Sequence, residues 1–270
     1  MKNLLLKLLM GVIIIFGSLS GDRLKIDPFP EGGTLTDIFN TNCLQMTQSQ
    51  QMLKAYIMSG LNSNFDSPKS SLESAIPLYD ERFRKIREYF QGIIKDKDAK
   101  KAFDEAQKIW DESREILRAK PTKDGALKLK DNFAQMIPLL LQGSKPASKG
   151  GLELLSLTGK LCRGPMKITI DYLLRIWGVE IPNYEDEVEM IIENFHKHLT
   201  KLMMNPLNTE KSDKLLKDVK RGFMFYEVMY KSQKNFIPNL LSRKADENFS
   251  LIREIKAIYK ERLKSQKKPD

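Results

Sequence analysis

Cysteine, histidine and tryptophan are scarce in this chain, with two of each among 270 residues. Two thiols exclude a disulfide-rich scaffold and leave room for one bond, between Cys43 and Cys162, if the protein reaches an oxidising compartment. Two free thiols are the open alternative. His196 and His198 diverge on a helix because they are two residues apart, whereas helical metal-binding pairs are spaced i, i+4. We therefore expect no metal and no other cofactor.

Glycine and proline are confined to a few short stretches, and strand-type alternation is absent over any useful length. Between these stretches, apolar residues recur at helical spacing. The pattern predicts an all-α protein with helices at residues 34–62, 71–95, 98–118, 123–142, 148–177, 184–203, 209–232 and 235–264.

Only one apolar run stands out, from Leu4 to Phe16, and Lys7 interrupts it. A basic start, a short apolar core and the small residues up to Ser20 are typical of an export signal. The run is shorter than the about 20 apolar residues that span a bilayer. We predict a signal peptide at residues 1–20 and a soluble periplasmic protein. An uncleaved signal anchor, the alternative, would be its only membrane contact.

Charge excludes little, because the chain carries 45 basic and 35 acidic residues for a net charge of +10. Removing residues 1–20 removes Lys2 and Lys7 and leaves +8. The excess favours acidic partners or anionic surfaces only weakly. The densest basic cluster is read as a solvated helix end, and export argues against a nucleic-acid partner. That cluster comprises Lys260, Arg262, Lys264, Lys267 and Lys268.

Internal repetition is the strongest pattern in the sequence. The segment Ile76-Pro77-Leu78-Tyr79-Asp80 resembles Ile181-Pro182-Asn183-Tyr184-Glu185, and Ile137-Pro138 resembles Ile237-Pro238 in the same order. The offsets are 105 and 100 residues. Four amphipathic helices bury their apolar stripes most simply as a bundle. The sequence therefore predicts two tandem up-down four-helix bundles, at residues 21–145 and 146–270.

One helix at the start of each half resembles a known family. Residues 40–56 read NTNCLQMTQSQQMLKAY, and the second half carries Leu157-Thr158-Gly159-Lys160 and Tyr172-Leu173. These segments resemble the N-terminal motif of the PilJ-type domain, the sensory region of type IV pilus methyl-accepting chemotaxis transducers. The first copy keeps Asn40, Gln45, Ser49, Gln50, Met52, Lys54 and Tyr56 of that motif.

The chain also departs from the family. Where family members place arginines in this helix, the first copy has Leu44, Met46 and Gln51, and the second copy has Pro165-Met166 in place of the Ser-Gln pair. We expect Pro165 to kink its helix. The resemblance implies a sensory module that acts through a partner, which is an exported or membrane-complex protein.

Two sets of side chains are candidate ligand sites. Lys160, Arg163 and Lys167 share one helix face and would hold a small anion, although a solvated basic face is the alternative. Gln45, Ser49, Gln50 and Tyr56 belong to the motif in the first helix. They would line a polar pocket, or form a hydrogen-bonded layer inside the bundle.

No catalytic arrangement is recognisable in the sequence. It has no Ser-His-acid set, phosphate-binding Gly-rich loop or Cys-x-x-Cys motif. We therefore expect a non-enzymatic periplasmic binding or sensory protein. The alternative is a structural adaptor in an envelope assembly such as a pilus or a motor.

Overall fold

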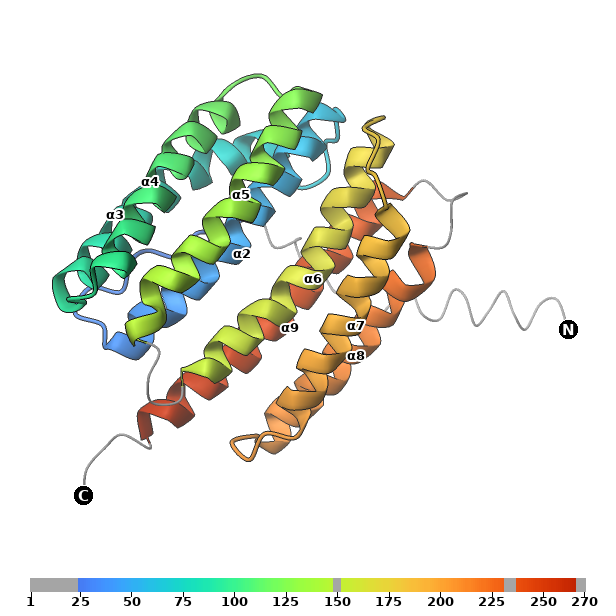
Figure 1. Ribbon diagram of the computed structural model, residues 1–270. Helices are drawn as coiled ribbons and strands as arrows, with labels where there is room; N and C mark the ends of the chain where they lie inside the picture. Colours follow the sequence, from blue (N-terminus) through green and yellow to red (C-terminus); the bar gives the residue numbers. More distant parts are fainter. Residues whose placement is uncertain (1–23, 148–151, 231–236, 266–270) are drawn as a thin grey trace, which may run out of the picture.

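The computed structural model describes residues 24–147, 152–230 and 237–265 (Figure 1). Throughout that part of the chain the regular elements are helices, as the sequence predicts. The α-helices are α2 (Leu35–Gly60), α3 (Pro68–Ile93), α4 (Lys97–Arg118), α5 (Lys123–Ser144), α6 (Glu153–Ile176), α7 (Tyr184–Met203), α8 (Glu210–Met229) and α9 (Pro238–Ser265), with a short 3₁₀ turn η1 (Lys145–Ala147) after α5.

The predicted helix bounds agree with these to within a few residues wherever both are described. The predicted signal peptide at residues 1–20, the helix limits at 148, 232 and 235, and the basic residues Lys267 and Lys268 lie outside the described residues. In the part that is described, no helix is both long enough and apolar enough to cross a membrane.

Side-chain caps set several helix starts. Thr34 and Asp37 form a reciprocal capping box at the start of α2, and Asp96 and Thr122 accept hydrogen bonds from the first turns of α4 and α5. Such caps satisfy backbone N–H groups that have no partner within the helix. The helix starts are therefore encoded locally, which explains why periodicity locates them well.

Each half of the chain closes a ring of packed helices. In the first half α2 packs against α3 and α5, while α4 packs against α3 and α5; the same pattern joins α6, α7, α8 and α9. Helix α2 also contacts α6 and α9, so the halves meet along the two central helices (Figure 1). The buried apolar side chains form one continuous core across both halves.

The two halves share local details at a spacing of 115 or 116 residues. Helices α2 and α6 end alike, with Asn62 and Gly178 at positive φ and the same capping hydrogen bonds 116 residues apart. The hydroxyl of Tyr56 accepts from the backbone N–H of Thr122, which precedes α5. The hydroxyl of Tyr172 likewise accepts a hydrogen bond from the backbone N–H of Ile237, which precedes α9. In α5 and α9, Asn132-Phe133 corresponds to Asn248-Phe249 at the same 116-residue spacing.

Both sequence matches join prolines that are not in equivalent places. Pro138 lies inside α5, whereas Pro238 is the first residue of α9. A proline fits the first turn of a helix without loss of a hydrogen bond, so its presence there carries no repeat information. In the other match, Tyr79 of α3 and Tyr184 of α7 are both buried, but Pro77 lies inside α3 whereas Pro182 precedes α7. Pro165 lies inside α6, which runs without a break from Glu153 to Ile176.

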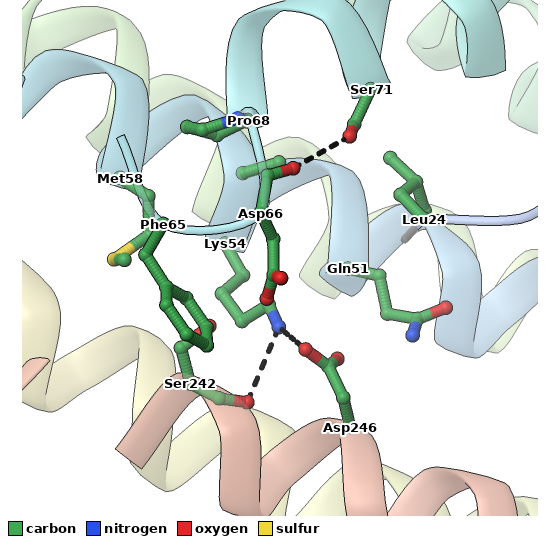
Figure 2. Close-up of a pocket in the computed structure, with 11 residues that line it drawn as sticks. Leu24, Gln51, Lys54, Met58, Phe65, Asp66, Pro68, Ser71, Ser242 and Asp246 are labelled. Atoms are coloured by element: carbon green, nitrogen blue, oxygen red, sulfur yellow. Dashed lines mark hydrogen bonds and ion pairs between the residues drawn. The ribbon is translucent and has the colours of Figure 1, made fainter. Parts of the chain in front are cut away.

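Two ion pairs of opposite polarity join the halves. Lys54 of α2 lies 2.5 Å from Asp246 of α9, with both side chains 8% exposed (Figure 2). Lys130 of α5 lies 2.6 Å from the fully buried carboxylate of Asp171 in α6. Lys130 and Asp246 are 116 residues apart, and Lys54 and Asp171 are 117 apart. The two pairs thus lie within one residue of equivalent positions and have reversed sign.

Candidate ligand-binding groove

An open groove runs along α6, between α5 on one side and α7 on the other. It encloses about 790 Å³ and includes residues of the loop between α6 and α7. Leu53, Phe133, Ile170 and Phe195 form a buried apolar floor. The size and the apolar floor with a few polar groups are typical of a binding site for a small molecule or a chain segment.

The groove brings together the three cations predicted from the sequence. Lys160, Arg163 and Lys167 all line it. Lys167 is neutralised by Glu187 of α7 at 2.7 Å, so it does not offer a free charge. Among the described residues, no carboxylate lies within 4 Å of Lys160 or Arg163. This leaves two cations without acidic partners at one end of the groove.

Arg163 is poorly satisfied by the protein. Its Nη1 lies 3.8 Å from the sulfur of Met46, the one hydrogen-bond contact that its side chain makes within the described chain. Burial lowers the pKa of its guanidinium, with opposing effects from Cys43 and Cys162. A guanidinium with five N–H donors and so little compensation is well suited to bind a carboxylate or another planar anion.

His198 of α7 completes this end of the groove. Burial lowers the pKa of its imidazole, and the positive charges of Lys160, Lys201, Arg163 and Lys197 lower it further. We call Lys160, Arg163 and His198 the basic end. The sequence gives no sign that His198 belongs there, because its place depends on how α7 packs against α6. His196 points elsewhere and contacts Glu227 of α8 at 2.5 Å.

The polar motif residues of α2 lie mostly away from the groove. Gln45 accepts from Arg82 Nε at 2.6 Å and donates to the carbonyl of Tyr79 at 3.1 Å. Ser49 donates to the carbonyl of Met46, and Tyr56 accepts from Thr122. These contacts fit the alternative of a hydrogen-bonded layer inside the protein. Gln50 does line the groove, and its side-chain oxygen is buried without a hydrogen-bond partner.

The two cysteines are buried free thiols at the contact between α2 and α6. Cys43 packs against Gly159, which lies about one helical turn before Cys162 on α6. The Cβ of Cys43 is 3.7 Å from the position that a Cβ on Gly159 would occupy. Burial raises the pKa of the Cys162 thiol to about 12, although Lys256 and Arg163 oppose this. Such a thiol is unreactive as a nucleophile near neutral pH. A bond between Cys43 and Cys162 remains a prediction.

The groove has little of the chemistry that covalent catalysis needs. Its described lining contains no Ser, Thr, Cys or Tyr side chain. The lining contains four acids, Asp131, Asp171, Glu180 and Glu187. Of these, Asp171 is paired with Lys130 and Glu187 with Lys167. Over the described residues, no group of three or more His, Cys, Asp and Glu side chains is placed to hold a metal ion. What the lining offers is an apolar floor and a cationic end.

No family model, curated protein or solved structure matches the chain. The likeness to the PilJ-type domain therefore rests on the motif residues themselves.

Proposed function

We propose that the protein is a non-enzymatic periplasmic binding protein that holds an anionic ligand at the basic end of the groove and acts through an exported or membrane-complex partner. The observation that carries this proposal is the pair of cations, Lys160 and Arg163, that have no acidic partner among the described residues and line a groove with an apolar floor. Leaving such charges uncompensated costs stability, which a bound anion would return.

The same proposal includes the architecture and the family. The closed rings α2–α5 and α6–α9 support a reading as two tandem four-helix bundles of the PilJ type, and the shared spacing of 115 or 116 residues supports a duplication. In this reading the second copy carries the ligand. The first copy has Leu44 and Thr47 at the positions that correspond to Lys160 and Arg163.

Ligand-dependent thermal stability tests this function. A ligand that binds only the native state raises the melting temperature, because it stabilises that state by RT ln(1 + c/Kd), where c is the free ligand concentration. We expect nitrate, aspartate or another small carboxylate to raise Tm in the wild-type protein and to leave Tm unchanged in Arg163→Glu. Lys217→Glu is the matched control, because Lys217 is exposed on α8 and the charge change is the same.

The alternative is a structural adaptor in an envelope assembly. The continuous core and the two buried ion pairs between the halves favour a rigid body, which suits a spacer. A screen without any stabilising anion, together with co-purification of a membrane-complex component that survives Arg163→Glu, would favour the adaptor and contradict anion binding.

A further inference from the structure

A second groove lies in the corresponding place on the other half, and the chain itself fills it. Residues 24–30 run extended beside α2, α3 and α9, with Ile26 buried. Gln48 donates to the carbonyl of Lys25 at 2.8 Å, and Arg82 donates to the carbonyl of Asp27 at 3.1 Å. Arg253 of α9 binds the carboxylate of Asp27 at 2.5 Å. Only about 30 Å³ remains beside this segment, next to Leu24 and Gln51 (Figure 2).

The residues that hold this segment have counterparts in the open groove. At the 116-residue spacing, Gln48 corresponds to Gly164 and Arg253 corresponds to Ile137. At the 105-residue spacing of α3 and α7, Arg82 corresponds to Glu187. All three counterparts line the open groove, as do Lys130 and Lys167, the counterparts of Asp246 and Gln51. The two grooves are therefore the same place in the two halves.

The open groove keeps the shape of that place but changes its chemistry. Gln48, which binds the backbone of residues 24–30, and Arg253, which binds the Asp27 carboxylate, are replaced by Gly164 and Ile137, which leave room and apolar surface. Arg82, which also binds that backbone, is replaced by Glu187, which is paired with Lys167. The cations lie further along α6, as Lys160 and Arg163, beside His198. No described segment of this chain crosses this groove. Its occupant would therefore place apolar side chains over the middle of α6 and carboxylates at the basic end.

We infer that the open groove binds an extended acidic segment of a partner protein, laid along α6 as residues 24–30 are laid along α2. This inference rests on the proposed function, since it names the class of ligand that the basic end holds. Charge complementarity supports an acidic occupant, and the filled groove shows that this place accepts an extended chain. The apolar floor supplies contacts that a free inorganic anion does not use.

Selection from a library of random octapeptides tests the inference. The protein is the chain from Gly21 onward, and the probes are the selected peptides themselves, prepared synthetically. We expect selected sequences to combine apolar residues with a following Asp or Glu. Arg163→Glu should weaken their binding at least about tenfold, which corresponds to about 1.4 kcal/mol. Lys217→Glu should change it less than about twofold. Binding should also weaken as salt is raised.

The outcomes separate this inference from the proposed function. If nitrate or aspartate stabilises the wild-type protein but not Arg163→Glu, and no peptide binds, the peptide inference is wrong and the anion site stands. If a peptide of residues 24–31 binds the groove more tightly than acidic library peptides, the occupant is a second copy of this chain and the partner inference is overturned. If peptides bind Arg163→Glu and Lys217→Glu equally, the groove is not their site. If neither anions nor peptides bind, both proposals are wrong.

Discussion

Replacement of Asp246 by Asn is expected to lower the free energy of unfolding by about 3 to 5 kcal/mol. The ammonium group of Lys54 is buried against this carboxylate at 2.5 Å and also donates to the carbonyl of Ser242 at 3.4 Å, with Asp66 lining the same pocket (Figure 2). Without the carboxylate, the buried charge of Lys54 would lose its closest acidic partner. Chemical denaturation monitored by circular dichroism measures the change.

Removing both charges together shows how much of the loss comes from leaving one charge buried without its partner. The double variant Lys54→Met/Asp246→Leu keeps similar volumes, and we expect it to recover most of the lost stability because no charge remains buried. Glu88→Gln, which breaks the exposed pair with Arg84, is the control and should cost less than about 1 kcal/mol. Equal losses for Asp246→Asn and Glu88→Gln would contradict the burial of the interface.

Arg82→Met is expected to destabilise the protein by about 3 kcal/mol and to release residues 24–30. The guanidinium is fully buried and donates to the side-chain oxygens of Gln45 and Gln48 and to the carbonyl of Asp27. Methionine fills the space but leaves these acceptors unpaired, and each hydrogen bond to a charged group is worth about 1.5 to 3 kcal/mol. Denaturation measures the loss.

Cleavage by trypsin measures the release of residues 24–30 independently of the stability of the whole protein. Lys25 is exposed, but the carbonyl at its scissile bond is held by Gln48. Cleavage after Lys25 should be slow in the wild-type protein and at least about tenfold faster in Arg82→Met. Arg84→Met, on the exposed face of the same helix, should leave both stability and cleavage nearly unchanged. Unchanged cleavage in Arg82→Met would show that Arg82 does not hold the segment.

The helices were predictable because their apolar stripes and caps are local features. Trp110, Phe103 and Ala106 of α4 recur at helical spacing and are all buried. Helix α2 is different, because α3, α5, α6 and α9 surround it and bury even Gln45, Gln48 and Ser49. Periodicity shows which residues share a face, but it does not show that a polar face is covered by another half of the chain.

The groove was predictable only in part. That Lys160, Arg163 and Lys167 share a face follows from their spacing on one helix. Which of them is neutralised depends on Glu187, and the inclusion of His198 depends on the packing of α7 against α6. The repeat register was obscured because a proline inside α5 and a proline opening α9 look identical in sequence.

The low pKa of His198 also sets the sign of a stability effect. The native state disfavours the protonated imidazole relative to the unfolded chain, because of burial and of the neighbouring cations. The stability that His198 contributes is therefore fully present above the ordinary histidine pKa of 6.5. It is lost as the pH falls through the lower native pKa, because the unfolded chain binds the proton more readily. A bound anion at the basic end would oppose the neighbouring cations and raise the pKa of His198.

The most direct test of the groove as a ligand site is an NMR titration of the two histidines. We expect His198 to titrate below 6.5 in the free protein and its pKa to rise when the best anion or acidic peptide is bound. The imidazole resonances of His196, which contacts Glu227 on α8, should move little when ligand is added and serve as the internal control. Saturating ligand that leaves the pKa of His198 unchanged, or shifts His196 instead, would contradict binding at the basic end.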